Sequence, residues 1–200
     1  INEDLQAIQD QAARFLTERA DPEYLKTLLD KPASFDSESW GSTAEMGWPM
    51  LSVDEAQGGL GLGLRGLAVL AQEMGRTTVS LPLLAVYQLA KILKVTNTEN
   101  DAVAVLESLM AGNAIACFVC ASPLALVQGK LQGRTVATPF AAVADYAIAL
   151  ADDSGQKKLV LVNLADAAVT KEAVPAIDQA RAQARLNFAD AEVTVLVTDN

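Results

Sequence analysis

The side chains able to do chemistry in this chain are few, and their types exclude several mechanisms. The sequence contains no histidine, which excludes Ser-His-Asp and Cys-His catalysis and histidine-ligated metals. Any proton transfer by this chain would therefore fall to a carboxylate, a tyrosine or a lysine. Cys117 and Cys120 form a CxxC pair inside an apolar run, without the second pair or the histidines that would complete four zinc ligands. We therefore predict buried thiols and no metal site.

Two carboxylates and two arginines are further candidates. Glu45 and Glu73 fall on predicted helix surfaces without a partner in view, and we interpret both as structural. Arg181 and Arg185 could meet substrate phosphates, since paired arginines bind them well, but exposure at the surface is the better interpretation. These residues alone predict no catalytic group.

The first half of the chain has the 3.6-residue periodicity of helices. Its apolar residues recur every three to four positions, as at Leu5, Ile8, Ala12 and Leu16. Start and stop signals predict one helix after a cap at Asn2 and others at about 22–30, 37–46 (capped by Ser37), 63–75, 82–94 and 98–111 (capped by Thr98).

The period changes after residue 112. Short apolar runs bounded by Gly, Pro, Asp or Asn follow, which we interpret as β-strands. The runs are 114–121, 124–132, 146–151, 158–164, 184–188 and 193–197. Because no helix separates consecutive strands, a Rossmann sheet is disfavoured and an antiparallel one is favoured. The sequence thus predicts an α+β fold, with an all-α helical bundle at 1–112 followed by a small antiparallel β-barrel-like domain at 113–200.

One block of thirty residues, 47–76, combines rare tryptophan, clustered glycine and a helix in a fixed order. A Gly-Trp pair precedes a turn at Gly58 and Gly59, and an amphipathic helix follows. Gly75 is expected to end that helix in a left-handed conformation, with the charge of Arg76 at the negative end of the helix dipole.

This order resembles the amino-terminal helical domain of acyl-CoA dehydrogenases, whose members carry a Gly-Trp, a short Val-containing segment, a Gly-Gly-x-Gly turn and a helix ending in Glu-x-Gly-Arg. In this chain the last motif reads Glu73, Met74, Gly75 and Arg76. The resemblance implies a β-domain after the helices and a second helical bundle after that. Since the chain starts at Ile1 and ends before such a bundle, we expect it to be a fragment of a longer protein.

The resemblance further implies the α,β-dehydrogenation of an acyl-CoA thioester, in which a glutamate removes the α-proton and the β-hydride passes to FAD. That glutamate belongs to the family's carboxy-terminal domain and is expected beyond residue 200, so no catalytic residue is assigned in this chain. Family members assemble into homo- or hetero-oligomers, and an acyl-CoA would be the substrate partner.

The family's two flavin motifs are only partly present. At the first, Thr-Glu-Pro-x-x-Gly-Ser-Asp, only Pro123 matches, and Ser122 is the nearest hydroxyl. At the second, Trp-Ile-Thr or Trp-Ile-Ser, the register places Ala137, Thr138 and Pro139 where an aromatic face and a hydroxyl are expected. Ser122 and Thr138 are therefore the predicted cofactor-binding residues. The departures leave two alternatives open: a non-catalytic subunit of a heteromeric acyl-CoA dehydrogenase with a degenerate flavin site, and a helical and β binding module unrelated to flavin.

Charge and hydropathy limit the partners and the location. The formal net charge of −10 and the pI of about 4.4 oppose binding to a phosphate backbone, so nucleic acid is not expected as a partner. No uninterrupted apolar run reaches the ~18 residues of a membrane span, so we predict no membrane-spanning segment. With no signal-like segment at the start, the default location is the cytoplasm.

Overall fold

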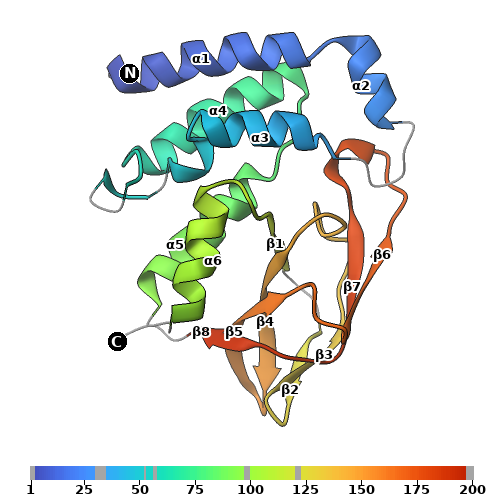
Figure 1. Cartoon of the computed structure of the whole chain (residues 1–200). Coiled ribbons are helices and arrows are strands. Elements are labelled where there is room, and N and C mark those ends of the chain that lie inside the picture. The colour runs from blue at the N-terminus through green and yellow to red at the C-terminus, as the bar shows by residue number, and fades with distance from the viewer. Residues whose placement is uncertain are drawn as a thin grey trace.

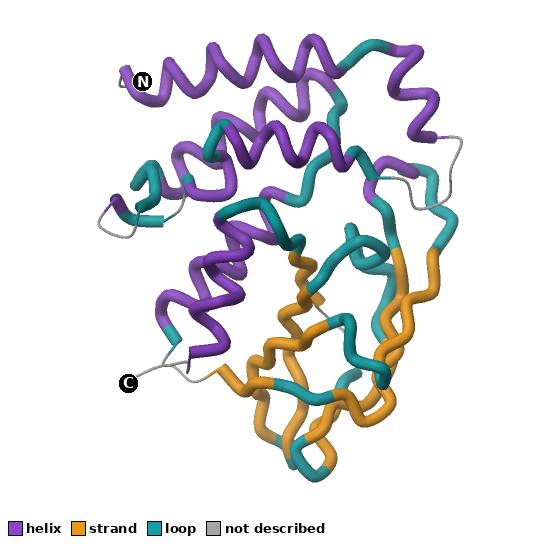
Figure 2. Tube along the Cα trace, viewed as in Figure 1, coloured by secondary structure: helices purple, strands orange, loops and turns teal. Residues whose placement is uncertain are grey.

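Helices make up the first half of the chain and strands the second (Figures 1 and 2). The computed structural model describes residues 3–29, 35–51, 53–55, 58–96, 100–119 and 123–196. The helices are α1 (Glu3–Arg19), α2 (Pro22–Leu29), α3 (Ser37–Glu45), the short 3-10 helix η1 (Trp48–Met50), α4 (Gly63–Thr77), α5 (Leu83–Val95) and α6 (Asn100–Met110). α1 packs along α4, and α5 packs against α6 (Figure 1). All six predicted helices are therefore present. Among the described residues, no helix has both the length and the apolar character that a membrane crossing needs.

A carboxylate begins α3 in place of the predicted hydroxyl. Oδ1 of Asp36 accepts a 2.9 Å hydrogen bond from the backbone N–H of Ser39, which makes Asp36 the cap and corrects the prediction of Ser37. Aspartate and serine are equally good caps, so the sequence pattern alone could not separate two such neighbours. The predicted cap at Thr98 lies outside the described residues.

α4 ends two residues later than the sequence pattern predicts. Gly75 keeps an ordinary helical conformation, and the helix continues to Thr77. Thr78 adopts the left-handed conformation instead, with a φ of 58°. The Thr77 hydroxyl also donates a 2.9 Å hydrogen bond to the backbone oxygen of Glu73. The predicted left-handed cap at Gly75 is therefore wrong, because this last turn is reinforced and the chain leaves the helix three residues further on.

Within residues 113–119 and 123–196, which the structure describes, the strands form one mixed sheet of eight. The strands are β1 (Ala116–Val119), β2 (Ala125–Val127), β3 (Lys130–Arg134), β4 (Tyr146–Asp153), β5 (Gln156–Asn163), β6 (Val169–Ala173), β7 (Ala184–Ala191) and β8 (Thr194–Leu196). Their order is β6-β7-β3-β2-β4-β5-β8, and β1 pairs with β4 beside this path.

The predicted α+β class is confirmed, with two differences in the sheet. β1 and β2 both pair with β4 in parallel, whereas the other pairs are antiparallel. Parallel pairing is possible because a long connection returns the chain from β1 to β4. The parallel pairs make the sheet mixed. The described strands leave it open, with edges at β6 and β8, so it is not a closed barrel.

Two strand positions also differ from the predicted ones. The predicted run at 124–132 covers β2 and the first part of β3, which form a hairpin that turns at Gln128 and Gly129, both with positive φ. β6 was not predicted, because its residues are mostly exposed and lack the apolar alternation of a half-buried strand. It pairs with β7 alone and forms one edge of the sheet.

The helices and the sheet share one buried cluster of apolar side chains, and α5 packs on β1. After α6 the chain turns through Gly112, which has a φ of 70°. Trp40 of α3 donates a 2.9 Å hydrogen bond from Nε1 to the carbonyl of Gly112. This bond holds the point at which the helices give way to the strands. The division into domains at 1–112 and 113–200 stays a prediction.

Gly112 provides a test of this junction. A Cβ at position 112 would overlap the side chain of Ala44 on α3, and the positive φ adds strain. We expect Gly112→Ala to lower the free energy of unfolding of the full-length protein by about 2–5 kcal/mol. Gly129→Ala is the control, because it shares the positive φ but no described atom lies within 4 Å of the added Cβ. The control should lose only about 1–2 kcal/mol. Equal losses for both variants in urea denaturation would contradict the close contact between α3 and Gly112.

Candidate functional site

A cleft of about 810 Å³ opens between the helices and the sheet. One wall is built by the last turns of α4, the connection at 78–82 and the first turns of α5. The other wall comes from β1, the loop after residue 138 and the 3-10 turn η3 (Gln179–Arg181). The lining residues are Ala71, Met74, Gly75, Thr78, Val79, Ser80, Leu81, Pro82, Leu84, Ala85, Gln88, Phe118, Pro139, Phe140, Asp178 and Arg181. The fold thus gathers into one site residues that no sequence pattern connected.

The lining is mostly apolar, with charged groups on its solvent-exposed side. Leu81 is buried, whereas Leu84, a large apolar side chain, is 58% exposed. Arg181 and Asp178 form an ion pair of 2.7 Å, and both side chains are about half exposed. An apolar molecule with a polar end would fit this arrangement, because its apolar part covers the wall while its polar end stays near water.

Two residues of the lining hold a left-handed backbone conformation without being glycine. Thr78 has a φ of 58° and Phe140 a φ of 60°, a conformation that costs roughly 1–2 kcal/mol per residue. Contacts hold Phe140 in place, since its N–H donates a 2.6 Å hydrogen bond to the carbonyl of Arg181 and its ring meets that of Phe35 edge-on. Such strain persists only where the surrounding structure maintains it, and it is common at binding sites.

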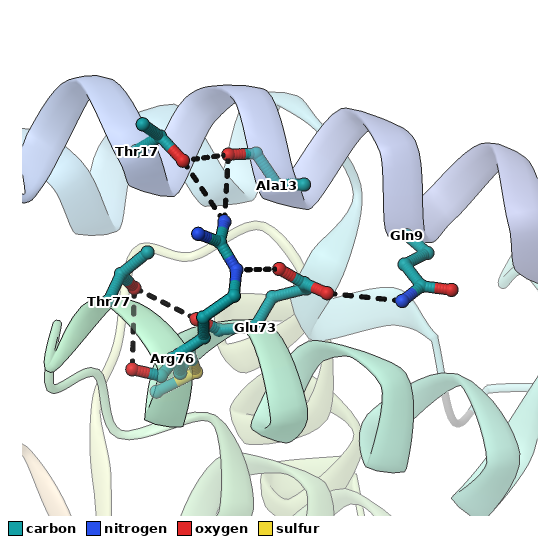
Figure 3. Close-up of polar contacts among 7 residues, drawn as sticks. Gln9, Ala13, Thr17, Glu73, Arg76 and Thr77 are labelled. Atoms are coloured by element: carbon teal, nitrogen blue, oxygen red, sulfur yellow. Dashed lines mark hydrogen bonds and ion pairs between the residues drawn. The ribbon is translucent and has the colours of Figure 1, made fainter.

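The buried carboxylate of Glu73 joins the last turns of α4 to α1 (Figure 3). Oε2 of Glu73 accepts a 2.8 Å hydrogen bond from Nε of Arg76, and Oε1 accepts a 3.1 Å bond from Nε2 of Gln9 on α1. Nη2 of Arg76 in turn donates to Oγ1 of Thr17 at 3.0 Å and to the carbonyl of Ala13 at 3.4 Å. We refer to these five residues as the clasp, because they tie α4 to α1.

The prediction that Glu73 lies on a helix surface without a partner is wrong. α1 covers this face of α4, so only 4% of Glu73 is exposed. The Arg76 guanidinium, followed by the Gln9 amide, stabilises the charged form and holds the pKa of Glu73 below its ordinary value. A carboxylate held ionised in this way is a weak base, which agrees with a structural role. Glu45 is exposed, as predicted.

The two candidate arginines are each paired with a carboxylate. Arg181 pairs with Asp178 and lines the cleft. Arg185 lies 3.7 Å from Glu172 and is not among the described lining residues. The fold therefore does not bring the two guanidinium groups together as one phosphate site at the cleft.

Thr138 directly precedes the cleft-lining residues Pro139 and Phe140 in the sequence, and its hydroxyl forms a hydrogen bond within the protein. Its backbone pairs with the start of β7, and Oγ1 donates a 3.1 Å hydrogen bond to the carbonyl of Val136. Only 3% of Thr138 is exposed, although its neighbours Pro139 and Phe140 line the cleft. The flavin contact assigned to Thr138 stays a prediction, and Ser122 lies outside the described residues.

Cysteine does not form a reactive site in the described part of the chain. Cys117 in β1 is buried, and burial raises the pKa of its thiol to about 12, so it stays protonated at neutral pH. The prediction of a buried thiol is confirmed for Cys117, while Cys120 lies outside the described residues. Across the residues that the structure describes, no group of three Cys, Asp or Glu side chains could hold a metal ion.

Residues 2–123 decide the family of the chain. They match the sequence model described as “Acyl-CoA dehydrogenase, N-terminal domain”, which covers more than half of the chain. The chain belongs to the acyl-CoA dehydrogenase family. The match includes the block at 47–76, so the resemblance based on that block is confirmed.

Solved structures share this fold at low sequence identity. The ChsE4-ChsE5 complex from Mycobacterium tuberculosis gives a TM-score of 0.86 at 19% identity, over 99% of this chain and 56% of that one. An acyl-CoA dehydrogenase from Geobacillus kaustophilus gives 0.82 at 16% identity, over 100% and 59% of the two chains. PigA with FAD and proline gives 0.80 at 17% identity, over 100% and 59%. The chain thus spans a little more than half the length of these proteins. No curated protein sequence matches it.

Glu73→Gln tests the clasp through the pH dependence of stability. Because the native carboxyl has a lowered pKa, the unfolded chain takes up a proton first on acidification. The stabilisation is therefore present above the ordinary carboxyl pKa and is lost as the pH falls through the native one. We expect the fall in Tm between about pH 6 and about pH 3 to be smaller in Glu73→Gln than in the wild type.

Glu45→Gln is the matched control for this measurement, because Glu45 is exposed and lies outside the clasp. It should keep the pH dependence of the wild type. If Glu73→Gln also kept it, Glu73 would not be held as a charged group between α4 and α1.

Proposed function

We propose that this chain forms the acyl-binding part of a flavin-dependent acyl-CoA dehydrogenase. The observation that carries the proposal is the apolar cleft between α4, α5 and the sheet, in a chain of this family. An acyl-CoA thioester combines an apolar acyl part with a large polar part that bears phosphates. An apolar wall with an ion pair on its exposed side suits that combination.

The chain's own residues would bind and orient the acyl part. Leu81, Leu84 and Phe118 offer apolar surface and exclude water from the bound chain. Arg181 lies on the exposed side, where an acceptor oxygen of the polar part could compete with Asp178 for its guanidinium. The reaction of the whole protein would be α,β-dehydrogenation of the thioester with FAD as hydride acceptor. No described residue is assigned as the base.

The described residues do not by themselves fit a flavin ring. Where the family's motif has an aromatic and a hydroxyl, this chain has Ala137, a buried Thr138 bonded to Val136, and Pro139. Aromatic stacking contributes about 0.5–1.5 kcal/mol beyond area burial and a good hydrogen bond about 1 kcal/mol. This segment offers neither contribution, so we derive no step through a flavin at this position.

That poor fit favours a second candidate function, a non-catalytic subunit whose flavin is held together with a homologous partner chain. The similar ChsE4-ChsE5 structure is a complex, so assembly from different subunits occurs with this fold. Both candidates use the same acyl-binding cleft. The two candidates differ in whether this protein binds flavin without a partner. In both candidates, FAD is the proposed cofactor of the assembled enzyme.

Leu84→Asp tests the cleft as the acyl-binding site. Leu84 is exposed in the first turn of α5, so a carboxylate there is compatible with the fold but leaves an acyl chain against a charge. We expect the variant of the full-length protein to bind butanoyl-CoA at least about tenfold more weakly in calorimetric titration.

Leu64→Asp is the matched control. Leu64 is 66% exposed in the first turn of α4 and is not among the described lining residues. Its affinity for butanoyl-CoA should equal that of the wild type. Equal weakening by both substitutions, or by neither, would contradict the acyl-binding role of the cleft.

Thr138→Val tests the flavin contact predicted for Thr138, and the flavin content of the wild type separates the two candidates. Because the Thr138 hydroxyl is bonded to Val136, we expect the variant to retain the wild-type ratio of flavin to protein, measured by visible absorbance. The measurement is made on the full-length protein alone and with any co-encoded homologous subunit. Thr138→Ser, which keeps the hydroxyl, is the control. A loss of flavin in Thr138→Val but not in Thr138→Ser would establish the flavin contact. Flavin bound by the wild-type protein alone would establish the enzyme that binds flavin without a partner. Flavin that is bound only with the second subunit would establish the shared site.

A further inference from the structure

The open edge of β6 presents backbone groups that no described strand bonds. Within the described strands β6 pairs with β7 alone, in antiparallel register. Residues that bond across such a pair alternate with residues whose N–H and C=O groups point the other way. The N–H of Val174 donates to the carbonyl of Gln183, just before β7. Counting back by twos from Val174, the backbone groups of Lys171 and Ala173 face the open side of the strand.

The side chain of Lys171 lies on the core face of this edge strand. Lys171 is directly opposite Leu186 of β7, which is fully buried, and opposite residues of an antiparallel pair point to the same face. Nζ of Lys171 donates a 2.6 Å hydrogen bond to the carbonyl of Ala144. Burial raises the pKa of the Cys117 thiol in β1, and the nearby charge of Lys171 lowers it by a smaller amount. The ammonium therefore lies at the rim of the apolar interior.

Lys171 has no carboxylate partner within the described part of the chain, whose ion pairs do not include it. The Ala144 carbonyl and water satisfy its ammonium instead, because the residue is exposed. A strand added beside β6 would extend the inner face of the sheet and cover this side chain. The ammonium would then lose water without gaining a carboxylate, and burying an unpaired charge is strongly unfavourable.

We propose that Lys171 prevents the β6 edge from pairing with a second copy of the chain. Inward-facing charges on edge strands are one of the devices by which natural sheets avoid such pairing. Two copies of β6 would pair antiparallel about a two-fold axis, and the register that bonds both open residues sets Lys171 opposite Ala173 of the second copy. The two ammonium groups would then be diagonal neighbours on the covered face. On the outer face, Glu172 would lie opposite Glu172 of the second copy, and like charges directly opposite are destabilising.

The test compares Lys171→Val with the wild type in the full-length protein, by light scattering after size-exclusion chromatography over a range of protein concentrations. Valine favours strands and replaces the ammonium by apolar surface. We expect the apparent mass to rise with concentration to about twice that of the wild-type assembly. The net charge becomes more negative by one, which opposes association, so a change in overall charge does not explain that result. Lys171→Arg keeps the charge and should stay at the wild-type mass.

Lys130→Val is the matched control, because it makes the same substitution in β3, which lies between β2 and β7 and is not an edge. It should keep the wild-type mass. Ala173→Pro, added to Lys171→Val, removes an N–H on the open side without breaking a bond to β7. This double variant should return to the wild-type mass, which would place the association at the β6 edge.

A Lys171→Val protein that keeps the wild-type mass at all concentrations would overturn the proposal. Association of Lys130→Val as well, or of the double variant with Ala173→Pro, would also overturn it, because the β6 edge would then not be the contact. Far-ultraviolet circular dichroism checks that each variant is folded. Lys171→Met, which keeps the length of the side chain, should associate like Lys171→Val. Loss of the fold in both would show that the charge serves folding and not the protection of the edge.

Discussion

The hydrogen bonds that Glu73 and Arg76 form with α1 fix the last turn of α4 against that helix, and the cleft depends on the position of this turn. Because Met74 and Gly75, which line the cleft, belong to the same helical turn as Glu73 and Arg76, the two sets of residues move together. The connection at 78–82 follows immediately and leads into α5, which packs on β1. The buried carboxylate of Glu73 stabilises the contact between α4 and α1 at this turn. Its charge requires partners, which are Arg76 on the same helix and Gln9 on α1. The bond from Gln9 and the bonds from Arg76 to Thr17 and Ala13 hold the two helices together.

The opposite wall is held by backbone geometry. Phe140 keeps a left-handed conformation because its N–H bonds to the carbonyl of Arg181, which brings the loop after Thr138 and the turn η3 together. The same arrangement buries Thr138 and engages its hydroxyl with Val136. One local fold thus shapes the apolar wall and keeps the Thr138 hydroxyl bonded within the protein.

Periodicity was sufficient to predict the helices and most of the strands, because amphipathic patterns are local. Features that depend on distant residues were not predictable. Glu73 was predicted to lie on the surface, because its partner Gln9 is 64 positions away in the sequence. The end of α4 was misplaced because glycine is the usual left-handed residue, whereas this chain uses Thr78. β6 was not predicted, because an exposed edge strand lacks apolar alternation. The cleft combines segments from both halves of the chain, and only the fold shows that they meet.

In the proposed function, the acyl part of an acyl-CoA lies between the end of α4, the start of α5 and the sheet. Amide hydrogen exchange of the full-length protein, with butanoyl-CoA and with CoA alone, tests that placement most directly. We predict that butanoyl-CoA slows exchange in residues 78–88 and in the loop that carries Phe140, and that CoA alone protects these segments less. Protection confined to other parts of the protein, or equal protection by CoA alone, would contradict the account.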